Sequence, residues 1–400
     1  MINTVVFKTK TAIDSHRFPG ANLPTWPVAV DIGYSSVKMV SPNRAACIPS
    51  YVLENTGTSI DEKVIGSLDR SAIAYRGKDG REFWVGQMAL DNMAYYGKDS
   101  DTSTSMYVRD RYAQDAFKIL AEVGMALGLQ ENQYGNPENK PVSVQTGLPP
   151  KYLSEDAPYI KEAFAGDHEF DLRIGKDNRW HHFSFTVNIG NVNVMSQPMG
   201  TLFAIMFDAN GGYSPYAKKI LQSDSLVFDP GFGTLDLFHC KGGAIIDEPL
   251  TRKELGMRAV FERCGELIKE NRGLQKAISI DQIESSLYTG IIKGADPAAA
   301  RKHMPADVNF AEELEQANHE ICENAMKLLD EKYNYMSSMD YLVVTGGTGS
   351  AWLNQMKNCY GNLTTLHILP GNQNFPNMSN VFANVIGYYM SLYSSMKRTR

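Results

Sequence analysis

Three stretches of the chain combine apolar runs with short glycine-containing turns. Residues 28–38 and 225–236 share one pattern: an apolar run, an aspartate, a turn with glycine, small hydroxyl residues and a second apolar run. This pattern predicts a strand, a tight hairpin turn and a second strand, with the aspartate at the tip. A third stretch, 341–349, predicts a strand that leads into a glycine-rich turn. Because the hairpin pattern occurs twice, about 200 residues apart, we expect two similar domains that face each other across one ligand.

Apolar periodicity predicts strands and helices over most of the remaining chain. In the first half we expect strands at 27–32, 36–41, 47–52, 71–76, 81–86, 141–147 and 181–188, and helices at 109–127 and 151–165. In the second half we expect strands at 242–247, 339–345 and 364–369, and helices at 252–270, 309–335 and 376–396. Residues 290–306 break the helical pattern and predict a surface loop. Hairpins with appended helices in both halves predict an α/β protein.

The length and the breaker residues suggest where the domains begin and end. A chain of 400 residues is long enough for two or three domains with ample cores. Residues 1–25 are mostly polar and end in a breaker-rich stretch, Pro19–Pro24, so we expect them to form an N-terminal extension. We expect domain I to contain residues 26–222 together with 376–400, and domain II to contain residues 223–375.

Composition and charge narrow the class of protein. The net charge is −6 and the pI is about 5.8, which argues against broad direct binding to DNA. No apolar run approaches the roughly 18 residues of a membrane span, and no secretory signal precedes the first strand. The cysteines are scattered without C-x-x-C spacing, which indicates reduced thiols in a cytoplasmic protein; they are Cys47, Cys240, Cys264, Cys322 and Cys359.

The turn residues suit a polyphosphate ligand. Backbone N–H groups can approach phosphate closely at Gly33, Gly231 and Gly233, where we expect left-handed turns. Lys38 is long enough to reach a β- or γ-phosphate as a point charge. Hydroxyl donors follow the glycines, at Ser35, Ser36 and Thr234.

Two acidic side chains at the same turns suggest a metal ion. Asp31 and Asp229 cannot bind phosphate directly, but they fit a Mg²⁺ ion held between them mostly through water. The alternative is that Asp-x-Gly is ordinary turn chemistry, which requires no ligand. Its repetition, with a third glycine-rich turn, favours the ligand site.

With these two hairpins and the third glycine-rich turn, the chain resembles the actin, sugar-kinase and heat-shock-chaperone superfamily. Within that superfamily it is most similar to the ParM-type bacterial actins. The motifs occur in the superfamily order: phosphate loop one at 31–38, a connecting segment near 194–200, phosphate loop two at 229–236 and an adenosine loop at 345–349. Further similarity to ParM covers Phe83–Leu90, Val194–Thr201 and Asn384–Tyr389. The resemblance implies a duplicated, ribonuclease H-like actin fold with a nucleotide cleft between its two domains.

The resemblance also implies the residues that contact the nucleotide, which would be ATP or GTP with Mg²⁺. Loop one would contribute Gly33, Tyr34, Ser35, Ser36 and Lys38; loop two would contribute Gly231, Phe232, Gly233 and Thr234; the adenosine loop would contribute Gly346, Gly347 and Thr348. A helix that starts near Gly349 would direct its positive end at the ligand. Glu254, Arg258 and Trp352 are candidates for the walls of the base slot, although Trp352 also fits a core position.

Gln197 is the catalytic candidate, together with Asp229 at the metal. Hydrolysis of ATP needs a polar side chain that orients a water molecule toward the γ-phosphate, and the ParM-like family has Glu or Gln at this strand end. A Gln is a weak base, so it would position and polarise the water. Alternatively, Gln197 caps the following helix, with Pro198 in its first turn. Gln145, at another strand end, is a rival for the catalytic role.

The resemblance therefore implies a nucleotide-dependent, filament-forming ATPase that moves plasmid DNA through a separate, ParR-like DNA-binding adaptor. Its partners would be further copies of itself, stacked head to tail, and the adaptor, with neither DNA nor membrane bound directly. A small-molecule kinase of the same superfamily is the main alternative, with Asp110 or Asp156 as its general base. A monomeric chaperone-like regulator is less compatible, because no residues remain for a substrate-binding domain.

Overall fold

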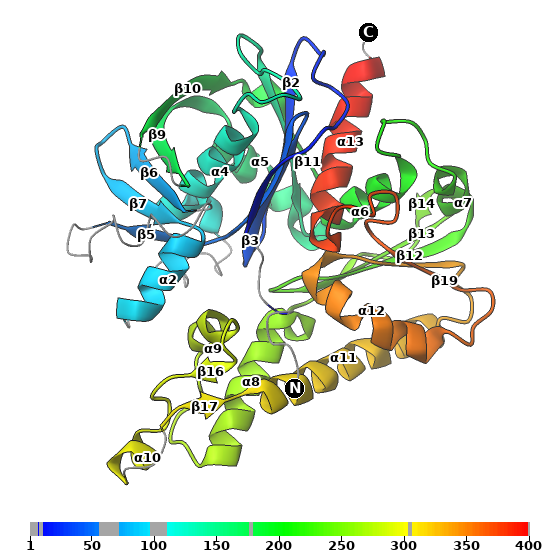
Figure 1. Ribbon diagram of the computed structural model, residues 1–400. Coiled ribbons are helices and arrows are strands. Elements are labelled where there is room, and N and C mark those ends of the chain that lie inside the picture. Colours follow the sequence, from blue (N-terminus) through cyan, green and yellow to red (C-terminus); the bar gives the residue numbers. More distant parts are fainter. Residues whose placement is uncertain are drawn as a thin grey trace. The chain divides into compact units, whose positions relative to one another are not determined.

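The computed structural model describes residues 7, 11–55, 72–96, 110–175, 179–302 and 306–398. The chain divides into two compact units. Among the described residues, one unit, here called the split unit, combines those of 11–220 with those of 371–398, and the other, the inserted unit, combines those of 221–370 with Phe7. Both units contain a sheet with helices, as Figure 1 shows.

The main sheet of the split unit has six strands in the order β1-β4-β3-β2-β8-β11. β1 to β4 pair antiparallel, whereas β8 and β11 run parallel to β2. The strands are β1 (Ala12–Ser15), β2 (Trp26–Ile32), β3 (Ser36–Ser41), β4 (Arg44–Pro49), β8 (Val142–Leu148) and β11 (Val192–Ser196). β1 comes from the segment expected to be an extension, and it pairs with β4 from Ala12 to Ser15.

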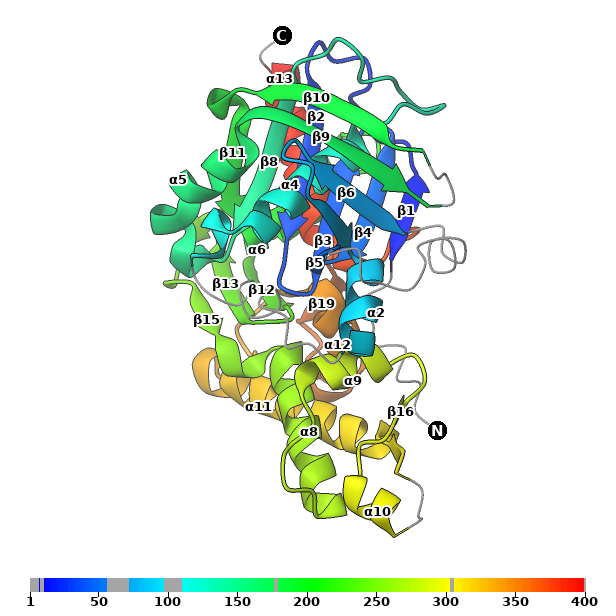
Figure 2. The same ribbon diagram turned by 90° about the vertical axis from the view of Figure 1, so that its left-hand side faces the viewer.

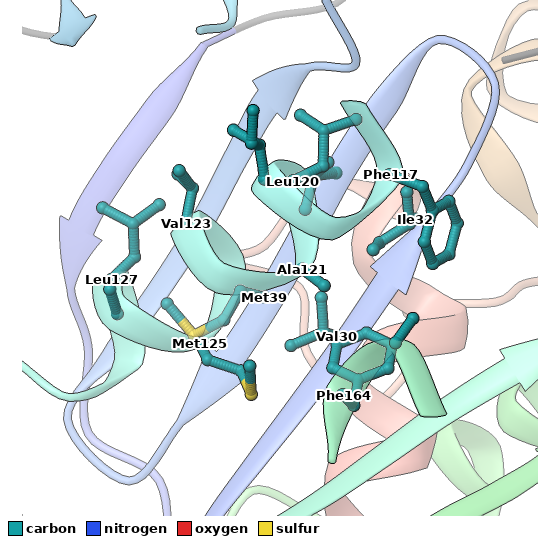
Figure 3. Packing of buried hydrophobic residues seen from close by; sticks show 14 of the residues in the cluster. Val30, Ile32, Met39, Phe117, Leu120, Ala121, Val123, Met125, Leu127 and Phe164 are labelled. Atoms are coloured by element: carbon teal, nitrogen blue, oxygen red, sulfur yellow. The ribbon is translucent and has the colours of Figure 1, made fainter. Parts of the chain in front are cut away.

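Helices cover both faces of this sheet because both faces of its central strands are apolar. Val28, Val30 and Ile32 pack against α4 (Asp115–Gly128) and Phe164 of α5 (Leu153–Phe164), as Figure 3 shows for Val30, Ile32 and Phe164. Successive strand residues point to opposite faces, so Ala29 packs with α6 (Gln197–Met206) and α13 (Ala383–Arg398). In Figure 2, α4 and α13 lie on opposite sides of β2 and β3.

A second, five-stranded sheet of the split unit has the order β10-β9-β6-β7-β5. The sequence pattern does not predict β9, which pairs with both β10 and β6. The strands of this sheet are β5 (Val52–Glu54), β6 (Ile73–Gly77), β7 (Glu82–Val85), β9 (Gly166–Ile174) and β10 (His181–Val187). The helix α2 (Gln87–Tyr96) follows β7.

The inserted unit is built on a sheet in the order β14-β13-β12-β18-β19, with β15 also paired to β13. One face of this sheet forms a continuous core with its long helices. The strands are β12 (Asp224–Pro230), β13 (Leu235–Lys241), β14 (Ala244–Ile245), β15 (Leu250–Arg252), β18 (Tyr341–Val344) and β19 (His367–Pro370). The long helices are α8 (Met257–Arg272), α11 (Ala311–Tyr333) and α12 (Gly346–Tyr360).

The remaining elements are short. They are α7 (Tyr216–Gln222), α9 (Ile280–Ser286), α10 (Pro297–Arg301), the strand pair β16 (Ile291–Ile292) and β17 (Val308–Asn309), and the 3-10 turns η2 (Arg111–Ala113), η3 (Pro150–Tyr152), η4 (Ile189–Asn191), η5 (Lys253–Leu255) and η6 (Asn380–Phe382). The expected loop at 290–306 therefore contains β16 and α10.

Several predicted boundaries are wrong for identifiable reasons. The strand expected at 242–247 shrinks to β14, because Gly242 and Gly243 adopt left-handed φ angles of 58° and 81° and form the turn. The helix expected from residue 252 begins only at Met257, because residues 250–252 pair with β13. The helix expected at 109–127 is interrupted at Gln114, which is extended and separates η2 from α4; residue 109 itself lies outside the described residues.

Candidate nucleotide site

Phosphate loop one is a two-stranded hairpin whose turn is fixed by hydrogen bonds. Asp31 lies opposite Lys38 and Ile32 opposite Val37 in the β2–β3 ladder. The turn closes through the backbone N–H of Gly33, which donates to the carbonyl of Ser36 at 3.0 Å. The fold therefore places residues 33–36 together at one end of the hairpin.

A residue that the sequence pattern did not single out supports this turn from outside. The hydroxyl of buried Ser50 donates to the carbonyl of Gly33 at 2.8 Å, and its backbone N–H donates to the carbonyl of Ser35 at 3.0 Å. Ser50 thus engages two carbonyls of the turn. The sequence around Ser50 contains no pattern that predicts its contact with the turn, because its partners lie 15 to 17 positions earlier in the chain.

Asp31 is buried, with a 3% exposed surface, and both carboxylate oxygens have partners. Lys38 Nζ lies 3.2 Å from Oδ2, and Gln197 Nε2 donates to Oδ1 at 3.5 Å. An ion pair removed from water is stronger than the same pair at the surface. Asp31, Lys38 and Gln197, predicted for three different roles, are therefore neighbours in the split unit.

Gln197 is the first residue of α6, and the N-cap of that helix is Ser196. The alternative that Gln197 itself caps the helix is therefore wrong, and its side chain contacts Asp31. The rival Gln145 lies within β8 opposite Ala29, and its amide donates to the carbonyl of its neighbour Thr146.

Phosphate loop two repeats the hairpin design in the inserted unit. Asp229 lies opposite Asp236 in the β12–β13 ladder. The backbone N–H of Gly231 donates to the carbonyl of Thr234 at 2.7 Å, the same turn-closing bond that Gly33 makes in loop one. The two motifs are thus matched in register as well as in sequence.

The difference between the hairpins is the residue opposite the aspartate. Loop one has a lysine there, whereas loop two has Asp236, a second buried carboxylate. Burial raises the pKa of Asp236 to about 7, and the nearby Asp229 charge acts in the same direction, while hydroxyl hydrogen bonds from Thr251 (2.5 Å) and Thr234 (3.1 Å) oppose the rise. The pair concentrates negative charge beside loop two.

The start of α8 is bonded to loop two. The backbone N–H groups of Met257 and Arg258 donate to the carbonyls of Gly231 (3.1 Å) and Phe232 (2.8 Å). A Cβ on the N-cap residue Gly256 would lie only 2.6 Å from the Phe232 carbonyl oxygen, so this close approach requires glycine. The helix start thereby fixes the direction of both turn carbonyls.

The expected adenosine loop is the first turn of a helix. α12 begins at Gly346, three residues before the predicted start, with Thr345 as its N-cap and Gly347 and Thr348 in its first turn. The Thr345 side chain makes no capping bond, and its buried hydroxyl has no hydrogen-bond partner in the described structure. The Thr348 hydroxyl donates to the carbonyl of Gly231 at 3.0 Å, which joins this turn to loop two.

The left-handed turns expected at the glycines of the two phosphate loops are absent, whereas the expected close approach of their backbone to phosphate stays a prediction. Gly33, Gly231 and Gly233 are not among the glycines with positive φ, whereas Gly346 is, at 78°. A Cβ at Gly346 would lie 3.1 Å from the carbonyl oxygen of Pro230 and 3.2 Å from Asp229. The left-handed glycine of the site therefore lies at the start of α12.

Of the base-slot candidates, Trp352 belongs to the core. It is fully buried, and its indole N–H donates to Asn318 at 2.8 Å. Glu254 is exposed in η5, and the Arg258 side chain pairs with Glu262 along α8. For the kinase alternative, Asp110 is exposed before η2 and Asp156 is buried within α5.

The comparisons with known proteins agree with this architecture. Residues 29–200 match the family model of the N-terminal domain of actin-like proteins. No curated protein sequence matches the chain. None of the described helices combines the length and the apolar character needed to cross a bilayer.

Solved structures share the fold over nearly the whole chain. A 15-stranded ParM filament from Clostridium botulinum has a TM-score of 0.67 at 17% identity, over 94% of this chain and 99% of that one. The apo pSK41 ParM protein has a TM-score of 0.58 at 19% identity, over 94% and 99%. The archaeal actin homolog Ta0583 in complex with ADP has a TM-score of 0.57 at 14% identity, over 91% and 97%. The predicted actin-like α/β fold is thereby confirmed.

Proposed function

We propose that this chain is a ParM-like member of the actin family and acts as a nucleotide-dependent, filament-forming ATPase that segregates plasmid DNA. The observation that carries the proposal is the repeated hairpin: Asp31 and Asp229 are buried at equivalent positions, each before a turn closed by a glycine N–H. The actin homolog solved with ADP and the ParM solved as a filament support nucleotide binding and self-assembly.

The phosphates would bind to both hairpins. Loop one would contribute backbone groups of residues 33–36 and the Lys38 ammonium, which must then be shared between Asp31 and phosphate. Loop two would contribute residues 231–234. Because the hydroxyls of Thr234 and Thr348 already donate to Asp236 and Gly231, we expect these threonines to contact nucleotide mainly through their backbone N–H groups.

The adenosine end of the nucleotide would lie against the start of α12. Gly346 and Gly347 carry no side chain, so the ribose and the α-phosphate would be able to approach the backbone closely. The first-turn N–H groups of the helix would attract the negatively charged α-phosphate. The 15-residue length of α12 and its lack of a side-chain cap suit this role. The Thr345 hydroxyl would gain a partner there.

The residues fit a Mg²⁺ ion held largely by water. Within the described ranges, no three His, Cys, Asp or Glu side chains cluster as a protein-only metal site, which agrees with the preference of Mg²⁺ for water and phosphate oxygens. Asp229 would hold the ion beside the buried carboxylate of Asp236, and Asp31 would bind through water, since its oxygens face Lys38 and Gln197. The ion would neutralise phosphate charge.

Gln197 would orient the attacking water. Its amide nitrogen donates to Asp31, so its side-chain oxygen is the atom available to accept a hydrogen bond from water. The contact with a buried aspartate fixes the orientation of the amide, which is the property that positioning requires. Hydrolysis would then remove the phosphate that links the loops, and the assembled state would lose its advantage.

A head-to-tail contact that does not close into a ring produces a filament. The net charge of −6 favours an indirect route to DNA, through a ParR-like adaptor on a plasmid centromere. We test the proposal by light scattering and pelleting of the full chain at micromolar concentration with Mg²⁺ and ATP, GTP or ADP, followed by electron microscopy. Equal pelleting with and without nucleotide, and no filaments, would contradict it and favour the small-molecule kinase.

A further inference from the structure

A buried arginine lies beneath phosphate loop one. Arg111, in η2, has a 4% exposed surface. Its Nη2 donates to the carbonyl of Ile32 at 3.3 Å, and its guanidinium carbon lies 4.4 Å from the ring centre of Tyr34. Because Ile32 and Tyr34 flank Gly33, the positive charge lies directly beside the turn.

Arg111 and Lys38 lie on opposite faces of the hairpin. Lys38 pairs with Asp31 on the face toward Gln197 of α6. Arg111 lies on the other face, 5.6 Å from the ring of Phe117 of α4, and Figure 3 shows Phe117 beside Ile32 at this end of the hairpin. The turn therefore has a cation on each side.

Only one of these two cations is neutralised by an adjacent carboxylate. In the part of the chain that the structure describes, no carboxylate lies within ion-pair distance of Arg111, and its Nη1 is buried without a hydrogen-bond partner. Aromatic rings surround it instead: Tyr34, Tyr112 at 5.4 Å and Phe117. Burial raises the pKa of the Tyr112 hydroxyl, the Arg111 charge lowers it, and Asp156 of α5 acts in the same direction as burial.

An arginine keeps its charge when buried, and a buried charge without a counter-ion is unfavourable. Cation–π contacts recover only a fraction of the lost hydration. Such an arrangement is favourable when an anion binds within a few ångströms, because the low local dielectric strengthens their attraction.

We propose that Arg111 supplies a fixed positive charge beneath phosphate loop one and makes this loop select nucleotides by the number of their phosphate groups. It acts as a positioning and electrostatic residue, without entering the reaction. This inference rests on the proposed function, in which loop one binds the phosphates.

The test compares nucleotides of different charge on the full chain. Dissociation constants for ATP, ADP and AMP are measured by calorimetry with Mg²⁺, at protein concentrations below the onset of assembly. Arg111→Gln keeps a donor for the Ile32 carbonyl and removes the charge, and Arg111→Lys keeps the charge. Arg81→Gln is the matched control, since it removes an exposed arginine of the same unit, paired with Asp79 and Asp115.

We expect Arg111→Gln to weaken ATP binding about tenfold, ADP binding about threefold and AMP binding less than about twofold. Arg111→Lys should restore most of the preference for ATP, and Arg81→Gln should change nothing. Equal weakening of all three nucleotides would show a purely structural role and overturn the inference, as would unchanged affinity. If Arg111→Gln does not fold, a folded Arg111→Lys decides: a retained ATP-to-AMP ratio supports the inference and a lost ratio overturns it. A wild-type chain that binds none of the nucleotides refutes the proposed function instead.

Discussion

Gly200 and Gly387 meet where α6 and α13 cross, and a methyl group on Gly387 would overlap the carbonyl oxygen of Gly200. A Cβ on Gly200 would in turn collide with the ring of Tyr388. One turn away, the hydroxyl of Thr201 donates to Asn384 at 2.5 Å. The two helices therefore touch backbone to backbone, and Gln197 lies three residues before this contact.

Gly387→Ala should destabilise the split unit by about 1–3 kcal/mol or more, because overpacking separates the helices. Since α6 begins with Gln197, we also expect slower hydrolysis in the folded fraction. Gly190→Ala is the control, because its added Cβ would meet only Asn188, at 3.4 Å. Urea unfolding and phosphate release measure the two effects; a Gly387→Ala protein as stable as the Gly190→Ala protein would refute the close crossing.

Gln197→Ala should separate hydrolysis from assembly. We expect turnover to fall about ten- to a thousandfold, since only the orientation of water is lost. ATP affinity should change little, and filaments should form and then persist. Phosphate release and light scattering are followed on one sample, beside Gln145→Ala. Normal release by Gln197→Ala with slow release by Gln145→Ala would transfer the role to Gln145.

Asp229→Asn should weaken Mg²⁺-dependent ATP binding about tenfold or more, because the amide has no charge with which to hold the ion. Binding measured in EDTA should change much less. Asp31→Asn should also reduce the effect of Mg²⁺, although it additionally leaves Lys38 without its ion-pair partner. If both variants retain the wild-type response to Mg²⁺, the two aspartates have only a structural role in the hairpin turns and do not bind the metal ion.

The Asp229–Asp236 pair predicts a dependence of stability on pH. The pKa of Asp236 is raised to about 7 from an ordinary value of 3.8. Between these values the folded state binds more protons than the unfolded state, so stability falls as the pH rises from about 4 to 7 and then levels off. The loss is on the order of a few kcal/mol, at 1.4 kcal/mol per unit.

Asp236→Asn should remove this part of the pH dependence. Its side-chain oxygen still accepts a hydrogen bond from Thr234 or Thr251, but it no longer ionises. Urea unfolding at pH 5 and pH 8, in EDTA and without nucleotide, compares the variant with the wild type. An equally steep loss of stability in both proteins would show that other groups cause it.

The sequence pattern predicted the hairpins well because their information is local. Apolar runs on both sides of an Asp-x-Gly turn specify a hairpin, and β2, β3 and β12 begin or end within a few residues of their predicted bounds. β9 was missed because its inward positions include His168, a residue that usually indicates an exposed surface. Its burial depends on Glu122 of α4, which accepts a hydrogen bond from the His168 ring at 3.0 Å.

The sequence pattern identifies the glycines, hydroxyl residues and aspartates of the candidate site, but it does not identify the residues that hold the turns in place. Ser50 acts on a turn in another part of the chain. The charge of Asp236 matters because cross-strand pairing brings it opposite Asp229, which requires the register of the ladder. Thr348 was expected to contact nucleotide, and only the tertiary structure shows that its hydroxyl is engaged by Gly231.

The split unit has a consequence for biosynthesis. Ala29 and Val40 are buried by residues of α13, and Thr201 bonds to Asn384 across 183 positions. A growing polypeptide therefore cannot complete the cover of this face of β2 and β3 until residues 383–398 have emerged from the ribosome, because α6 supplies only part of it. Residues 221–370, in contrast, are contiguous and available to fold earlier. The half of the protein that is translated first is thus completed last, and its apolar sheet face is the surface that a nascent-chain chaperone would meet.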